Sequence, residues 1–232
     1  MPKFITWLME WFLNTQIWVR LARHQVAYFT FRLYGYPKFP MEKYFEIEAI
    51  LKNNQDPDCF FGFVAADQDS LSWKLTHAIT KAAWGHAGYL YIDPAGHIRC
   101  SHMKGDGLNN WNVLDILRES DCFAVLKYKL KPGFKDVLHS RLKAIETAPT
   151  VQYDYTMSLD SDIPNWLAEG IPMPSGEKPF NIYCSEYVYV LGHSITEPSF
   201  VAKDYEDRLV FEPDDAYHAG EVVFEYRYKK SN

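Results

Sequence analysis

The sequence predicts an α+β fold, and two observations carry this prediction. Segments with the apolar spacing of helices are mixed with short strand-like runs, without the regular strand–helix alternation of a parallel sheet. Hydrophobic residues make up 47% of the 232 residues and charged residues 23%, which is sufficient for a sizeable core. The net charge of −6 and the lack of a basic stripe argue against a nucleic-acid partner.

Residues 1–50 are predicted to form a mainly helical segment that precedes a domain spanning 51–232. The stretch FITWLMEWFLNTQIWVRLARH is apolar over a wide arc, but Glu10, Asn14 and Gln16 interrupt it, so an amphipathic helix fits better than a membrane span. Such a helix packs on the domain, packs on a second subunit in a homo-oligomer, or lies on a membrane surface. The predicted location is therefore cytoplasmic, with peripheral membrane association left open.

The remaining elements follow from local patterns and turn residues. The run CFFGFVAA (59–66) is typical of a buried strand, and DSLSWKLTHAITKA (69–82) of a helix. The turn DPAG (93–96) joins two strands, 86–92 and 97–103, into a hairpin. Further along, we expect a helix in 111–120, a strand at 122–130, a helix at 133–148, an irregular loop at 158–180, a helix after Cys184, and strands near 208–212 and 221–228.

Two histidines of this hairpin are candidate site residues. Strand side chains alternate between faces, so Ile98, Cys100 and His102 share one face. Because the DPAG turn is tight, we expect His102 to lie beside His86. There it would accept the Nδ1–H of His86 and orient that ring toward a nucleophile.

Cys184 is the candidate nucleophile. Unpaired cysteines are usually small core residues. The four cysteines are widely spaced with no CxxC pair, so we expect reduced thiols. A helix start, however, lowers a thiol's pKa, as does a neighbouring imidazolium, and the Cys184 N–H could bind an oxyanion. Candidate residues for further substrate or oxyanion contacts are Tyr153, Tyr155 and Tyr183.

Several motifs together resemble a known family. The segments WGHAGYLYID, GHIRCSHMKGDG, YDY, YCSEYVY and FEPDDA, in this order, are similar to the circularly permuted branch of the NlpC-type papain-like cysteine hydrolases, the YiiX/YaeF-like group, to which lecithin–retinol acyltransferase-like proteins are related. The resemblance covers residues 58–216. It implies a small antiparallel barrel-like sheet packed with helices. It also implies Cys184 as nucleophile, His86 as general base and His102 as third polar residue, with His97 and Ser101 as alternatives for that last role.

The resemblance implies a cysteine hydrolase that cleaves amide or peptide bonds through an acyl-enzyme intermediate, with no cofactor and no metal. A small peptide, amide or lipid ester is the expected substrate. Three alternatives stay open at this point. One is a lipid-directed thiol acyltransferase or esterase, and another is an inactive protein that binds lipid or peptide. The third is a zinc site formed by Cys100, His102, His86 and Cys184, since thiolates and imidazoles are common zinc ligands.

Overall fold

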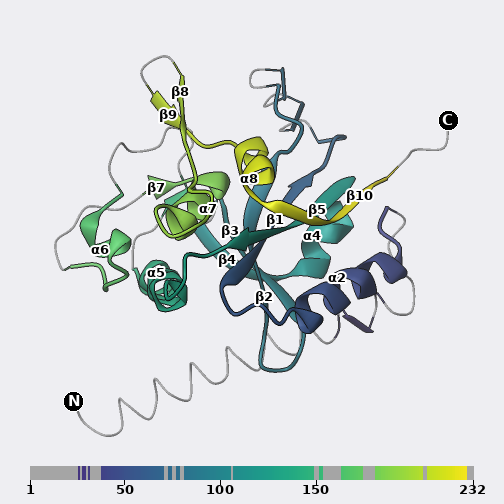
Figure 1. Cartoon of the computed structure of the whole chain (residues 1–232). Coiled ribbons are helices and arrows are strands. Elements are labelled where there is room, and N and C mark those ends of the chain that lie inside the picture. Colours follow the sequence, from purple (N-terminus) through teal and green to yellow (C-terminus); the bar gives the residue numbers. More distant parts are fainter. Residues whose placement is uncertain are drawn as a thin grey trace, which may run out of the picture.

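A six-stranded antiparallel sheet in the order β10-β5-β1-β2-β3-β4 forms the centre of the computed structural model (Figure 1). The structure describes residues 38–70, 73–74, 77–78, 81–105, 107–148, 152–153, 163–174, 181–205 and 208–228, together with 26, 28, 29 and 31. The strands are β1 (Cys59–Ala66), β2 (His86–Ile92), β3 (Ile98–Lys104), β4 (Gly107–Asn112), β5 (Cys122–Lys129) and β10 (Glu221–Arg227).

The predicted α+β class and the antiparallel sheet packed with helices are confirmed, but the predicted barrel-like closure is wrong. Strands β10 and β4 are the two outer strands of the sheet, so the described sheet is open. Closure depends on pairing between strands that are distant in sequence, and no local pattern of apolar residues encodes it.

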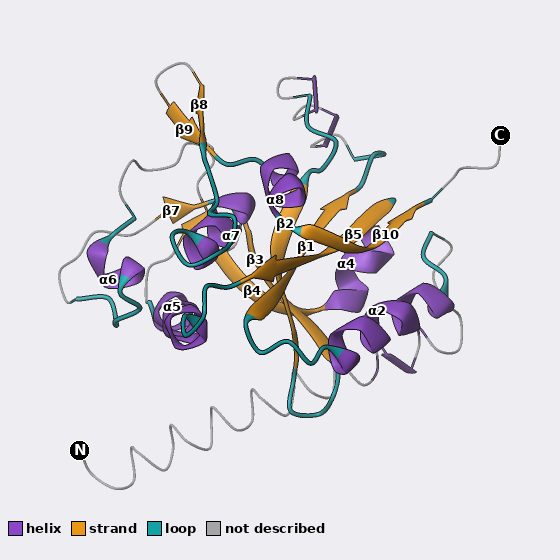
Figure 2. Cartoon of the chain, in the orientation of Figure 1, coloured by secondary structure: helices purple, strands orange, loops and turns teal. Residues whose placement is uncertain are grey.

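Helices cover both faces of the sheet (Figure 2). Helices α2 (Met41–Asn53) and α4 (Val113–Glu119) share one core with the β1 residues Phe61, Phe63 and Ala65. Helices α5 (Lys135–Thr147), α7 (Cys184–Gly192) and α8 (Pro213–Ala219) share the other core with alternate β1 residues, among them Phe60 and Val64. The continuous apolar run of β1 is explained by this arrangement, because a central strand with both faces covered has no polar side.

Several smaller elements were not predicted. Strand β4 replaces a predicted loop, and α8 lies between the two terminal strands. The 158–180 loop includes the short helix α6 (Asn165–Ala168). Two small sheets pair β6 (Gln152–Tyr153) with β7 (Asn181–Ile182), and β8 (Lys203–Tyr205) with β9 (Arg208–Val210). Of the predicted helix 69–82, residues 73–74 and 77–78 are helical, whereas the described residues 69–70 and 81–82 at its two ends are not.

The end of the N-terminal segment is part of the domain core. The predicted amphipathic helix in residues 4–24 lies outside the described residues. Helix α2, however, runs through the boundary that we predicted after residue 50, and its buried Tyr44, Ile47 and Leu51 pack against the sheet. Residues 41–50 therefore belong with the domain rather than with a separate segment.

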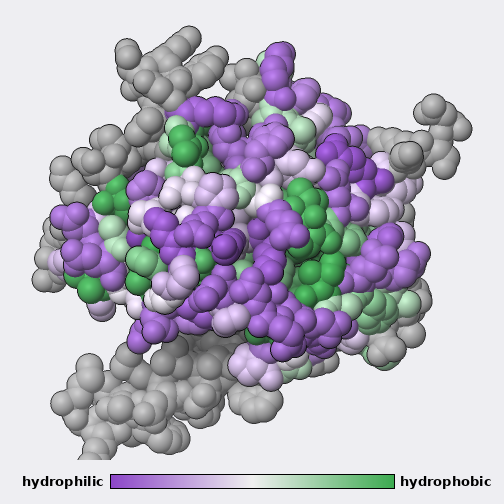
Figure 3. Space-filling model, viewed as in Figure 1, coloured by the Kyte–Doolittle hydropathy of each residue, from purple (hydrophilic) through white to green (hydrophobic). Residues whose placement is uncertain are grey.

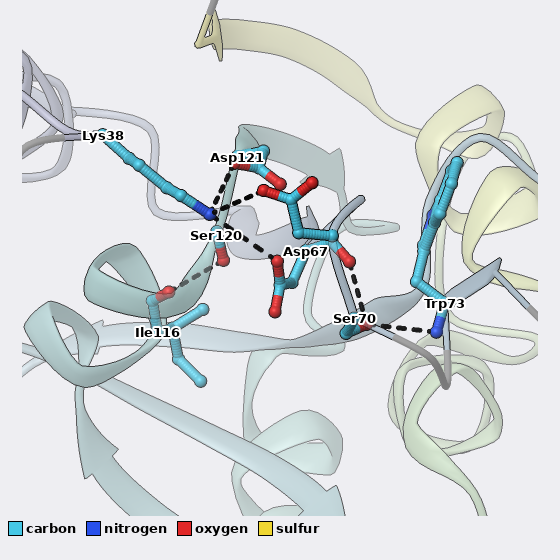
Figure 4. Close-up of polar contacts among 8 residues, drawn as sticks. Lys38, Asp67, Ser70, Trp73, Ile116, Ser120 and Asp121 are labelled. Atoms are coloured by element: carbon cyan, nitrogen blue, oxygen red, sulfur yellow. Dashed lines mark hydrogen bonds and ion pairs between the residues drawn. The ribbon is translucent and has the colours of Figure 1, made fainter. Parts of the chain in front are cut away.

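Lys38 fixes the chain just before α2. Its Nζ lies 2.8 Å from an Asp121 carboxylate oxygen, 3.6 Å from Asp69 and 3.8 Å from Asp67, at the end of β1 (Figure 4). Asp121 is buried, and the hydrogen bond to it raises the pKa of Lys38. The next residue, Phe39, is fully buried against Phe123 and Tyr226.

One face of the molecule is mainly polar (Figure 3). The face seen in Figure 3 is largely hydrophilic, with hydrophobic residues in scattered groups. Among the described helices, none has the length and apolar character that crossing a membrane requires.

Candidate functional site

The β2–β3 hairpin carries both candidate histidines. Its strands pair Tyr89 with Ser101 and Ile92 with Ile98, and the predicted turn closes with a 2.8 Å hydrogen bond from the Gly96 N–H to the Asp93 carbonyl. Gly96 has a φ of +83°, which explains the glycine at this turn position. This register sets His102 across from Gly88, one diagonal step from His86.

Gly88 gives the histidines room. A Cβ at Gly88 would lie 2.5 Å from the Phe63 ring, and 2.8 Å from both the His102 Cβ and the Ser101 carbonyl oxygen. No real Cβ tolerates such distances, so a residue without a side chain is required here. The two imidazoles occupy the space beside Phe63, whose ring centroid lies 5.9 Å from that of His86 and 6.2 Å from that of His102.

The two rings are directly hydrogen-bonded, as predicted, but through a different nitrogen. His86 Nε2 lies 2.6 Å from His102 Nδ1, whereas we expected His86 Nδ1 to make this contact. The rings meet edge to face with their centroids 4.8 Å apart. The step across the hairpin is diagonal, so the contact involves the outer end of the His86 ring. This leaves His86 Nδ1 as the nitrogen that can serve a nucleophile.

Burial keeps both rings neutral. Burial, with a smaller contribution from the Lys104 ammonium, lowers the pKa of His86 to about 3 and the pKa of His102 to about 2. The proximity of the two rings adds to the effect on His102, because two positive charges so close would repel each other. The imidazolium that we expected beside the thiol is therefore not the resting form of His86 at neutral pH.

Cys184 is the first residue of α7, as predicted, and it is only 6% exposed. The helix start is capped by Glu186, whose carboxylate accepts a 3.3 Å hydrogen bond from the Tyr183 N–H. Tyr183 itself is buried, and its hydroxyl accepts a 3.0 Å hydrogen bond from the Phe211 N–H. These contacts fix the backbone on which the thiol is carried.

Helix α7 packs on the strands that carry the histidines. The Tyr187 and Ser101 hydroxyls lie 2.8 Å apart, and Ala87 belongs to the same core as Tyr187. By strand alternation, this is the opposite face from the one on which His86 and His102 lie. The Cys184 sulfur can therefore reach His86 only beyond the edge of this face, at the start of β2, where His86 is the first residue. That contact stays a prediction.

The positions of the ends of α7 and β2 are consistent with a contact at the start of β2. After α7, Ile195 and Glu197 hydrogen-bond to Lys131 and Lys129, at the far end of β5. Because β5 and β2 both run antiparallel to β1, the end of β5 lies beside the start of β1 and the end of β2. The start of α7 is linked to the residues before β2 through Phe211, which hydrogen-bonds to Tyr183, and Asp214, which hydrogen-bonds to Ala83 and Trp84.

The other predicted site residues that the structure describes take no part in the hydrogen bond between His86 and His102. Ser101 points toward α7, and His97 lies next to the Asp93 turn at the other end of the hairpin, so neither replaces His102. Tyr155 lies outside the described residues, and Tyr153 is described only as part of β6. Among the described residues, no group of three or more histidine, cysteine or acidic side chains could hold a metal ion, so the zinc alternative is not supported. None of the four cysteines forms a disulfide bond.

Two residues that sequence reasoning missed bear on this site. Gly88 could have been found, because a glycine inside a strand often marks a close approach. Asp214 belongs to the FEPDDA motif, but no local pattern predicts its hydrogen bonds to Ala83 and Trp84. Comparisons with protein-family models, with curated proteins and with solved structures found no match.

Proposed function

We propose that the protein is a cysteine hydrolase that cleaves amide or peptide bonds, with Cys184 as nucleophile and His86 as general base. The observation that carries this proposal is the 2.6 Å hydrogen bond between His86 and His102 at the start of β2. It fits the base–orienter half of a nucleophile–base–orienter arrangement. The resemblance of the YCSEYVY and WGHAGYLYID segments to permuted papain-like hydrolases supports the same assignment.

The proposed role of His102 follows from proton positions. For His86 Nδ1 to accept the thiol proton, the neutral ring must carry its hydrogen on Nε2. That Nε2–H then donates to His102 Nδ1, which holds the required tautomer. When His86 gains the thiol proton, its Nε2–H becomes a charged donor and the bond to His102 strengthens.

The proposed reaction has two steps. The Cys184 sulfur attacks the carbonyl carbon while its proton passes to His86, and the tetrahedral oxyanion is stabilised by the Cys184 N–H at the start of α7. The intermediate collapses to a thioester as His86 returns the proton to the leaving amine. Water, deprotonated by His86, then hydrolyses the thioester and regenerates the thiol.

An ester substrate would pass through the same thioester, so the chemistry of the pair separates amides from esters only weakly. The lipid-directed alternative came from the aromatic residues of 1–24, which lie outside the described residues. We therefore propose amide substrates first and let the experiment include both classes.

Thiol-reactive probes test the proposal. The full chain is treated at neutral pH with vinyl sulfones that carry either a short peptide or a long acyl chain, and the labelled peptides are mapped. We expect Cys184 to react faster than Cys59 and Cys122, whose pKa values are raised by burial, and to prefer the peptide probe. His86→Ala should remove this advantage, whereas the control Cys122→Ser should not. Preference for the acyl probe would favour a lipid ester, and equal labelling of the three thiols would contradict the proposal.

A further inference from the structure

We propose that residues 211–214, immediately before and at the start of α8, position the start of α7 against the start of β2. This segment hydrogen-bonds to the residue before Cys184 and to the residues just before His86. The inference rests on the proposed function, because it concerns the spacing of the proposed nucleophile and base. Asp214 and Tyr183 are the positioning residues of this proposal.

Asp214 holds the start of β2. One carboxylate oxygen accepts a 3.0 Å hydrogen bond from the Ala83 N–H, and the other accepts a 2.9 Å hydrogen bond from the Trp84 N–H. Trp84 is 2% exposed, and its ring stacks on Tyr217 of α8 at a centroid distance of 5.2 Å. His86 follows only two residues later, so its backbone is tied to α8 from one side.

The same segment holds the start of α7. The Phe211 N–H donates a 3.0 Å hydrogen bond to the Tyr183 hydroxyl, and the Phe211 ring packs on Tyr189 with centroids 5.1 Å apart. Tyr183 directly precedes Cys184. Only two residues separate Phe211 from Asp214, so this short piece of chain joins the two backbones that carry the proposed pair.

Asp214 is not needed to cap its own helix. The carboxylate of the adjacent Asp215 accepts a 2.9 Å hydrogen bond from the Glu212 N–H and also pairs with Lys203. This leaves both oxygens of Asp214 directed at β2. The two neighbouring aspartates therefore have different partners: Asp215 caps α8, and Asp214 accepts hydrogen bonds from the residues just before β2. It also makes Asp214 a position where a change affects β2 more than it affects the start of α8.

Proton transfer between a thiol and an imidazole requires hydrogen-bond distance, and a misplacement of about 1 Å can cost about 100-fold in rate. Loss of either link should therefore reduce the His86-assisted reactivity of Cys184 without unfolding the chain. Asp214→Asn keeps the size of the side chain but replaces one acceptor oxygen with an NH₂ group. Tyr183→Phe removes only the hydroxyl.

The test measures iodoacetamide labelling of each cysteine from pH 5 to pH 9 in the full chain, together with thermal melting. We expect Asp214→Asn and Tyr183→Phe to slow Cys184 labelling at pH 7 about tenfold and to move its pH profile toward that of an ordinary thiol. Labelling of Cys59 and Cys122 should not change. Matched controls are Asp136→Asn, an exposed aspartate in the first turn of α5, and Tyr217→Phe, which removes a hydroxyl of α8 but keeps its ring.

The outcomes separate the two proposals. If the variants melt near wild type and their Cys184 profiles are unchanged, while His86→Ala still slows labelling, the positioning role is overturned and the proposed function stands. If Cys184 of the wild type is no faster than the other thiols and does not respond to His86→Ala, the proposed function fails first. Should Asp214→Asn fail to fold, Tyr183→Phe decides, because it leaves every charge in place.

Discussion

At the scale of single residues, the contact between His86 and His102 depends on a neighbouring glycine, Gly88. His102 fits against β2 because Gly88 has no side chain, and its ring then reaches the outer nitrogen of His86. The pairing followed from the sequence, since strand alternation and a tight DPAG turn bring the two residues together. The sequence did not predict which nitrogen of His86 makes the contact, because the diagonal step across the hairpin depends on the exact register.

His102 is expected to act by orienting His86. His102→Leu removes the acceptor for the His86 Nε2–H, so it should reduce the probe reactivity of Cys184 about as strongly as His86→Ala. His102→Asn retains an oxygen near the place of Nδ1 and should preserve much of the reactivity. The measurement is the labelling rate of Cys184 in the three variants. Equal losses in His102→Leu and His102→Asn, with both folded, would argue against the orienting role.

At the scale of elements, α7 is held at its far end by a buried arginine. Arg141 of α5 is 3% exposed and donates hydrogen bonds to the carbonyl oxygens of Ala168, Val190, Leu191 and His193. A cation at the carboxyl end of a helix meets the negative end of the helix dipole and the carbonyls that have no partner in the helix. This contact joins α5, α6 and α7.

Replacing this arginine should destabilise the fold. Arg141→Met fills much of the space but leaves the buried carbonyls without their donors, so we expect a loss of about 3 kcal/mol in the free energy of unfolding. Urea denaturation measures it. Arg118→Met, at an exposed arginine in the last turn of α4, serves as the control and should change little. A loss below about 1 kcal/mol in Arg141→Met would mean that water replaces the arginine.

Elements with strong local signals were predicted, and those formed by long-range pairing were not. The β2–β3 hairpin and the start of α7 at Cys184 follow from turn residues and apolar spacing. Strand β4, with the sequence GLNNWN, contains residue types that are rare in strands, and it forms because it pairs with β3 along its whole length. Helix α8 begins with Pro-Asp-Asp, a favourable helix start, but its seven residues are too few for a periodic signal.

At the scale of the whole molecule, the buried histidines should make stability depend on pH. Histidines of the unfolded chain titrate near pH ~6.5, whereas burial lowers the pKa of His86 to about 3 and of His102 to about 2. Between these values the unfolded chain binds more protons than the folded protein. The free energy of unfolding should therefore fall as the pH drops below about 6.5, by at most about 1.4 kcal/mol per pH unit for each histidine.

Urea denaturation between pH 7.5 and pH 4.5 tests this expectation. His102→Asn removes one of the two titrating groups, so its stability should fall less steeply than that of the wild type. His139→Gln, at an exposed histidine of α5, should follow the wild type. A slope in His102→Asn as steep as in the wild type would show that other groups dominate the acid sensitivity.

Lys38 sets a limit on how far the chain can be shortened from its beginning. A protease cut that leaves Lys38 in place keeps the cation beside the buried Asp121, and Phe39 stays in its pocket. A cut a few residues later removes both and leaves three carboxylates facing one another, one of them buried without its partner, at a cost of several kcal/mol. A fragment that keeps these contacts therefore begins at or before Lys38.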